Sequence, residues 1–172
     1  MQTDIRNAIR DVPDFPKPGI IFKDITPVLN DPKLFQQAIN LFVARVNKIG
    51  ADKIAVVESR GFLFGAPVAN SLGIGLVPIR KKGKLPYRTI EESYALEYGT
   101  ATLEVHEDAF NKGDRVVIID DLLATGGTAL ASAHLVEKLG AQVVEFEFLV
   151  ELAFLDGRKR LNGYNVYAPI VY

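Results

Sequence analysis

The chain has 172 residues and a formal net charge of −1, with 48% hydrophobic and 24% charged residues. This length is enough for one hydrophobic core, so we expect residues 1–172 to form a single domain. The absence of cysteine excludes disulfides, thiolate metal sites and a cysteine nucleophile. The near-neutral charge and the lack of a long apolar run argue against a nucleic-acid or membrane partner, and the expected location is the cytoplasm.

The first 50 residues predict an irregular lead-in followed by a helix. Residues 13–32 are rich in proline and read as an ordered segment without regular structure. Asp31-Pro32 then favours the start of a helix, because proline fits the first helical turn. Apolar residues from Phe35 to Val46 recur at the spacing of one helix face, and Gly50 is expected to end the helix.

The rest of the chain alternates strand and helix patterns. Continuous apolar runs predict buried strands at 53–58, 75–80, 116–119 and 143–152, with another near 164–170. A helix is expected from near Phe62, a long mobile loop over 81–93, and an antiparallel hairpin over 95–106. The predicted fold class is therefore α/β, with a mainly parallel twisted sheet flanked by helices.

The stretch VVIIDDLLATGGTA, residues 116–129, combines a buried strand, two carboxylates and a glycine turn. We expect the strand to end at Asp120 and Thr128 to cap the following helix. Ligands of parallel sheets bind beyond the carboxyl ends of the strands, where this loop lies. Gly126 and Gly127 would let backbone N–H groups at a helix N-terminus surround a phosphate.

Asp120 and Asp121 repel a phosphate, so they should face hydroxyl groups or a metal ion with its waters. A ligand with a phosphate at one end and vicinal hydroxyls nearby is a sugar phosphate. The stretch lacks the lysine of a nucleotide-triphosphate P-loop and the G-x-G-x-x-G of a dinucleotide fold. A solvated acid pair beside an ordinary capped turn is the alternative for either feature taken alone.

Three further places offer charged side chains for the same crevice. Arg60 follows the second strand and could bind a phosphate, although it can equally well be interpreted as an ordinary surface arginine. The run RKKGK, residues 80–84, suits a polyanionic small molecule or is a solvated basic loop. Glu97 could act as a general acid or base beside a loop that closes, although a lone glutamate is more often a strand-surface residue.

VVIIDDLLATGGTA resembles the phosphoribosyl-pyrophosphate motif of type I phosphoribosyltransferases, and its LLATGGT end is similar to adenine phosphoribosyltransferases in particular. FPKPGIIFKDITPVL, ESRGFLFGAPVA, RKKGKLP and YALEYGTATLEVH resemble the same family in order and spacing. The resemblance implies the type I fold, with a small N-terminal hood within residues 1–32 and a mobile loop or hairpin. It also implies the transfer of a phosphoribosyl group from phosphoribosyl pyrophosphate to adenine in purine salvage, giving AMP and pyrophosphate.

The resemblance also implies roles for four sets of residues. The phosphoribosyl group would be bound by Asp120, Asp121, Ala124, Thr125, Gly126, Gly127 and Thr128. The pyrophosphate would be bound by Ser59, Arg60, Arg80, Lys81 and Lys84, with a cis peptide between Glu58 and Ser59. The adenine would be bound by Ile21, Phe22, Lys23 and Leu122, with arginine in place of Lys23 in some members. Glu97 would be the catalytic residue, acting at the purine N7.

The implied cofactor is Mg²⁺, held mainly by phosphoribosyl pyrophosphate and water rather than by protein ligands. The basic set would act partly from a neighbouring subunit, which implies a homodimer. Two other functions stay open. One is a regulator that binds the sugar pyrophosphate as an effector, which would normally bring a DNA-binding domain or a basic face that we do not expect here. The other is a transferase for a 6-oxopurine base.

Overall fold

The computed structural model describes residues 2–15, 17–95 and 99–172. They fall into two compact units, Met1–Phe42 and Val43–Tyr172. The expectation of a single domain over residues 1–172 therefore stays a prediction. Within the described ranges, no helix has both the length and the apolar content needed to cross a membrane.

The first unit corrects the expectation of an irregular lead-in. It contains α1 (Gln2–Ala8), β1 (Arg10–Pro13), β2 (Ile21–Asp24), α2 (Thr26–Asn30) and the start of α3 (Pro32–Ile49). Strands β1 and β2 form an antiparallel pair, with Val12 opposite Phe22. The prolines fit this structure because Pro27 lies in the first turn of α2, where its missing N–H group costs no hydrogen bond.

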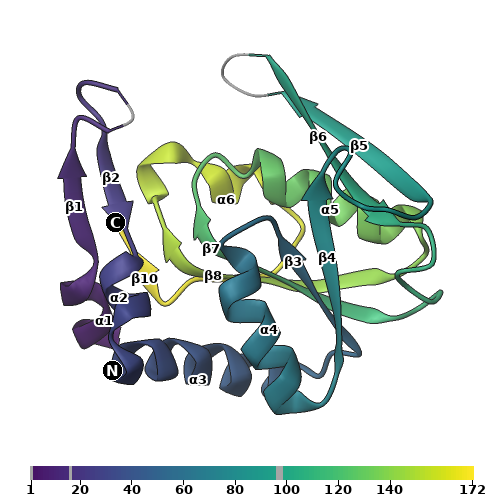
Figure 1. Cartoon of the computed structure of the whole chain (residues 1–172), viewed down its shortest axis with the longest axis horizontal. Coiled ribbons are helices and arrows are strands. Elements are labelled where there is room, and N and C mark those ends of the chain that lie inside the picture. The colour runs from purple at the N-terminus through teal and green to yellow at the C-terminus, as the bar shows by residue number, and fades with distance from the viewer. Residues whose placement is uncertain (1, 16, 96–98) are drawn as a thin grey trace. The chain divides into compact units, whose positions relative to one another are not determined.

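The second unit is built on an eight-stranded sheet (Figure 1). Its strands are β3 (Lys53–Val57), β4 (Gly75–Lys81), β5 (Thr89–Ala95), β6 (Thr100–His106), β7 (Arg115–Leu123), β8 (Gln142–Glu151), β9 (Val166–Tyr167) and β10 (Ile170–Val171). The order is β10-β8-β7-β3-β4-β6-β5, with β9 beside β8. Among the described strands of this sheet, β4–β6 and β6–β5 are the antiparallel pairs and the others are parallel. The predicted α/β class with a mainly parallel sheet is confirmed.

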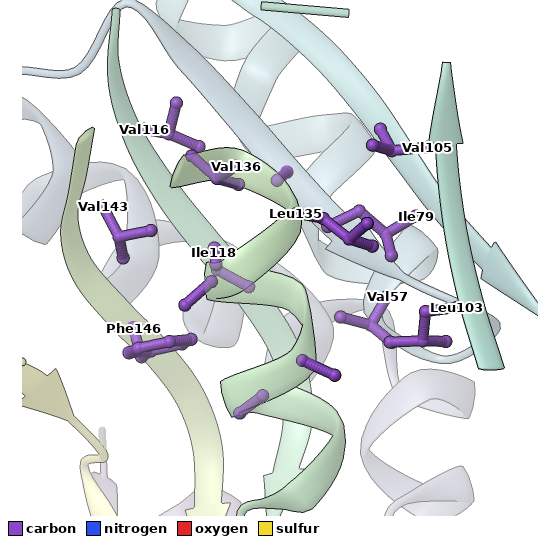
Figure 2. Packing of buried hydrophobic residues seen from close by; sticks show 14 of the residues in the cluster. Val57, Ile79, Leu103, Val105, Val116, Ile118, Leu135, Val136, Val143 and Phe146 are labelled. Carbon is purple, nitrogen blue, oxygen red and sulfur yellow. The ribbon is translucent and has the colours of Figure 1, made fainter. Parts of the chain in front are cut away.

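Helices cover both faces of this sheet, which explains the continuous apolar runs in its strands. The helices are α4 (Gly61–Leu72), α5 (Gly127–Lys138), α6 (Gly157–Arg160) and a short 3₁₀ turn at Ala153–Leu155. Ala55 and Val57 belong to a buried cluster that includes Leu135 and Val136 of α5 (Figure 2). Val56 points the other way, and its Cγ1 lies 1.9 Å from where a Cβ on Gly65 of α4 would be. Alternate residues of one strand are therefore buried under different helices.

The predicted loop over 81–93 is wrong in its second half. Residues Thr89–Ala95 form strand β5, which pairs with β6 along its whole length. Glu92 on this strand bonds to His134 Nδ1 at 2.8 Å and to Lys138 Nζ at 2.5 Å, both on α5. The polar sequence of this segment reflects a strand with alternate side chains exposed rather than an unstructured loop.

Strand β8 carries two carboxylates on one face that differ in their surroundings. Glu145 accepts two hydrogen bonds of 2.6 Å from the Arg45 guanidinium. Glu147 is fully buried, and neither of its carboxyl oxygens has a hydrogen-bond partner among the described residues. Burial, with a smaller contribution from the charge of Glu145, raises the pKa of Glu147 to about 9. Glu147 is therefore a neutral acid at pH 7.

Candidate active site

The segments that follow β3, β4 and β7 meet at the carboxyl edge of the sheet. They meet there because β3 lies between β4 and β7 and runs parallel to both. Glu58, Ser59 and Arg60 follow β3, and residues 124–128 follow β7. Two adjoining cavities of about 230 and 240 Å³ open here, and both are lined by Glu58, Arg60, Asp120 and Asp121. The structure thus brings the acid pair, the arginine and the glycine turn together.

The acid pair lies inside β7, which corrects the expectation that the strand ends at Asp120. Pairing with β3 stops at Ile119, whereas pairing with β8 continues to Leu123. The Asp121 N–H donates to Asp120 Oδ1 at 2.8 Å. Arg60 Nε donates to Asp121 Oδ2 at 2.5 Å. The two carboxyl groups are therefore held on a strand, which fixes them more firmly than a loop would.

The two aspartates differ in their electrostatic environment. Burial, and then the negative charge of Asp121, raise the pKa of Asp120 well above its ordinary value, and Arg60 opposes this only weakly. The shift favours the neutral form of Asp120, whereas the carboxylate of Asp121 forms an ion pair with Arg60. Positive charge arriving beside the pair would favour the ionised form of Asp120.

The glycine turn leaves the N-terminus of α5 open to an anion. Gly126 precedes the helix with φ +79°, a conformation that favours glycine, and no side chain caps the first turn. The predicted capping role of Thr128 is wrong, because its hydroxyl group donates to the Tyr94 hydroxyl at 2.9 Å instead. N–H groups of an uncapped first turn, together with the helix dipole, suit a phosphate.

Two carboxylates hold the basic loop after β4. Glu58 accepts from the Lys81 N–H at 3.0 Å and pairs with Lys84 Nζ at 3.1 Å and Arg80 Nε at 3.3 Å. Burial opposes ionisation of Glu58, but these donors outweigh it and lower its pKa. Glu104, also buried, accepts from the N–H groups of residues 84 and 85 at 2.7 and 2.8 Å. Lys81 lines the second cavity together with Arg60 and the acid pair.

Comparison with known proteins identifies the fold that carries this site. A family model, the phosphoribosyl transferase domain, matches residues 25–164. The adenine phosphoribosyltransferase of Desulfitobacterium hafniense (strain Y51) is 57% identical over 169 residues, which cover 98% of each chain. The chain belongs to the adenine phosphoribosyltransferases, within the phosphoribosyl transferase family.

Solved adenine phosphoribosyltransferases have the same fold. The enzyme from Thermoanaerobacter pseudethanolicus ATCC 33223 matches with a TM-score of 0.97 and 55% identity, covering 100% of both chains. The enzyme from Saccharomyces cerevisiae, solved with D-2,5-dideoxy-2,5-imino-altritol 1,6-bisphosphate and adenine, matches with a TM-score of 0.94 and 41% identity, covering 98% of this chain and 97% of that one. The expected type I phosphoribosyltransferase fold is confirmed.

Other residues that the family resemblance singles out are placed as follows. The Glu58–Ser59 peptide bond is cis, as expected, and Ser59 lines the second cavity. Leu122 lines the first cavity. Ile21, Phe22 and Lys23 lie on β2 in the first unit, where Lys23 Nζ bonds to Asp11 Oδ1 at 2.5 Å. Glu97 lies outside the described residues.

The sequence analysis missed three residues at this adenine phosphoribosyltransferase site. Tyr94 reaches Thr128 from strand β5, which was expected to be a loop. Gly61 lets α4 approach the acid pair, because a Cβ there would lie 2.7 Å from the Ile119 carbonyl oxygen. Gly157 packs against the turn, where its carbonyl oxygen lies 2.7 Å from where a Cβ on Gly126 would be. Two of the three lie in segments that resemble the family, Gly61 in ESRGFLFGAPVA and Tyr94 in YALEYGTATLEVH, whereas Gly157 lies in none of them.

The donor set at the site fits a magnesium ion that is carried mostly by its substrate. Among the residues that the structure describes, no group of three or more histidine and carboxylate side chains could hold a metal ion. The pair of Asp120 and Asp121 offers carboxylate oxygens beside an open cavity. Mg²⁺ keeps several waters and commonly binds through one or two carboxylates and substrate phosphates, so the acid pair is compatible with it.

Proposed function

We propose that this protein transfers the 5-phosphoribosyl group from phosphoribosyl pyrophosphate to adenine, forming AMP and pyrophosphate in purine salvage. The observation that carries the proposal is the uncapped N-terminus of α5 beside the acid pair in one cavity. This arrangement matches a ligand with a phosphate and vicinal hydroxyls. Membership of the adenine phosphoribosyltransferases supports adenine as the acceptor base.

The charges around the cavity suit departure of pyrophosphate from C1 of the ribose. The sugar ring gains positive charge as that bond breaks, and the carboxyl groups of Asp120 and Asp121 stabilise it. Arg60 and Lys81 stabilise the negative charge gathering on pyrophosphate. Burial raises the pKa of Asp120, and positive charge on the ligand would oppose that shift and favour its ionised form.

Mg²⁺ belongs to this proposal as a cofactor bound mainly by phosphoribosyl pyrophosphate and water, where it would neutralise leaving-group charge. Asp120 and Asp121 would face the ribose hydroxyls, and Ala124 to Thr128 would bind the 5′-phosphate. Arg80 and Lys84 would leave their ion pairs with Glu58 and bind the pyrophosphate instead. The pyrophosphate would lie in the same subunit or in a partner subunit. Ile21, Phe22, Lys23 and Leu122 would surround adenine.

Substrate selectivity gives the test of the proposed function. Purified protein with Mg²⁺ and phosphoribosyl pyrophosphate receives adenine, hypoxanthine or guanine, one base per reaction, and the nucleotide formed is measured by chromatography. We expect AMP from adenine and much slower reaction with the two 6-oxopurines. Faster reaction with hypoxanthine would favour a 6-oxopurine transferase, and sugar-pyrophosphate binding without any product would favour a regulator.

Glu97 is proposed to be the catalytic residue at the purine N7. Glu97→Gln is expected to lower kcat by ~10²-fold or more, because the amide cannot exchange a proton with the base, while phosphoribosyl pyrophosphate affinity changes little. Glu91→Gln is the matched control, because Glu91 is an exposed carboxylate on β5 that pairs with Lys82. Steady-state kinetics of both variants test the catalytic role of Glu97. A Glu97→Gln rate close to that of Glu91→Gln removes Glu97 from this role.

The proposal also includes a cytoplasmic homodimer, because the family resemblance places part of the basic set in a neighbouring subunit. Light scattering coupled to size-exclusion chromatography measures the mass of the assembly directly. A mass twice the 18.9 kDa of one chain is expected. A monomer that retains full activity would contradict the contribution from a partner.

A further inference from the structure

The backbone of helix α6 packs closely against the backbone of the glycine turn. A Cβ on Gly126 would lie 2.7 Å from the Gly157 carbonyl oxygen, and a Cβ on Gly157 would lie 2.1 Å from the Ala124 carbonyl oxygen. No side chain could fit at either position, so the two segments pack as closely as backbones allow. Figure 1 shows α6 beside α5 at this end of the sheet. The position of every α6 residue relative to the turn is therefore fixed.

This packing places the Arg160 guanidinium beside the N-terminus of α5. Arg160 Nη1 lies 3.1 Å from where a Cβ on Gly127 would be, and Arg160 Cβ lies 3.3 Å from the same point on Gly126. The Cα–Cβ bonds of a helix tilt toward its N-terminus. Because Gly127 is the first residue of α5, the space beside it adjoins the unpaired N–H groups of the first turn. The guanidinium occupies the space that the missing side chain leaves.

The other basic residues of α6 are paired with carboxylates. Arg158 pairs with Glu151, and Lys159 Nζ pairs with Asp156 Oδ1 at 2.8 Å. Arg160 is exposed and has no carboxylate partner among the described residues. A guanidinium with open donors next to a helix N-terminus adds a full positive charge to a place where N–H dipoles already favour an anion. Its natural partner is a doubly charged phosphate monoester.

We propose that Arg160 binds the 5′-phosphate of the phosphoribosyl group. The turn supplies backbone N–H donors from residues 125–128, and Arg160 supplies a charged hydrogen bond from the side of the turn. The proposal rests on the proposed function, because that function makes a sugar 5′-phosphate the ligand of the turn. Arg160 binds phosphate in both the substrate and AMP, so it contributes to affinity and not to the barrier of the chemical step.

Arg160→Ala and Lys159→Ala form a matched pair for the test. Both remove one positive charge from an exposed position of the same short helix, but only Arg160 lies beside the turn. Affinity for AMP is measured by calorimetry. Arg160→Ala should weaken AMP binding by ~10-fold, the size expected for losing one charged hydrogen bond. Lys159→Ala should bind AMP within about twofold of wild type, because its ammonium group faces Asp156.

Kinetics separate phosphate binding from a structural role. Arg160→Ala should raise the KM for phosphoribosyl pyrophosphate and leave kcat and the KM for adenine nearly unchanged. Arg160→Lys keeps the charge and should recover part of the affinity. Equal AMP affinity of Arg160→Ala and Lys159→Ala overturns the proposal, as does a fall in kcat at constant KM. Failure of the wild-type protein to form AMP would instead contradict the proposed function, so the two failures are distinguishable.

Discussion

A Gly126→Val variant should lose ~10³-fold or more in kcat/KM for phosphoribosyl pyrophosphate, which corresponds to about 4 kcal/mol. Two features of the structure lead to this expectation. Gly126 has φ +79°, which a β-branched residue adopts only as an outlier. Its Cβ would also lie 2.7 Å from the Gly157 carbonyl oxygen, which is backbone and cannot rotate away. The turn must therefore move, and its N–H groups would no longer converge on the phosphate.

Gly113→Val is the control for backbone strain alone. Gly113 has φ +86°, but nothing lies within 4 Å of where its Cβ would be. It precedes β7, whereas the turn follows the carboxyl end of that strand. The control should lose stability from a valine at positive φ and keep its KM for phosphoribosyl pyrophosphate. Similar losses of kcat/KM in the two variants, measured on folded protein, would mean that the turn does not hold the phosphate.

The second large effect concerns stability rather than catalysis. Burial raises the pKa of Glu147 from an ordinary 4.5 to about 9, so folding takes up a proton between these values. A raised acid pKa makes the folded state less stable as pH rises, by about 1.4 kcal/mol per unit in this window. Between pH 5.5 and pH 8 the loss from this group is roughly 3 kcal/mol. Glu147→Gln keeps the shape without the titration and should be more stable than wild type at pH 8.

Urea unfolding at pH 5.5 and pH 8 measures this effect. The advantage of Glu147→Gln should be smaller at pH 5.5 than at pH 8 by roughly 3 kcal/mol, because pH 5.5 lies only one unit above the ordinary pKa of 4.5. Glu145→Gln serves as the control of opposite sign, because Glu145 on the same strand is paired with Arg45. Removing that charge should destabilise the protein. A Glu147→Gln variant with the wild-type pH dependence of unfolding would show that Glu147 is not a buried neutral acid.

Sequence patterns predicted the centre of the sheet because β3 and β7 are buried along most of their length. The runs around Ile54 and Ile118 are apolar since helices cover both faces, which is typical of a central parallel strand. The run around Val77 alternates between buried and exposed residues. The polar residues at the carboxyl ends of these strands were correctly expected at one edge of the sheet, although Asp120 and Asp121 lie within the last part of β7 rather than after it. This inference needed only the parallel direction of neighbouring strands.

The parts that escaped prediction depend on contacts between residues distant in the sequence. Strand β5 looks like a loop because half of its side chains are exposed, and its pairing with β6 is invisible locally. Thr128 looks like a helix cap, but Tyr94, 34 residues earlier, takes its hydroxyl group. Arg160 carries no motif at all. Its place beside Gly127 follows from the packing of Gly157 against the turn, which only the fold reveals.

The central claim is that the turn formed by residues 124–128 holds a phosphate monoester while Asp120 and Asp121 face the attached ribose. A crystal structure of the protein with AMP tests it most directly. We expect the phosphate oxygens to accept hydrogen bonds from the backbone N–H groups of Thr125 to Thr128, with the ribose hydroxyls toward the two carboxyl groups. AMP bound elsewhere, with nothing in the turn, would contradict the claim.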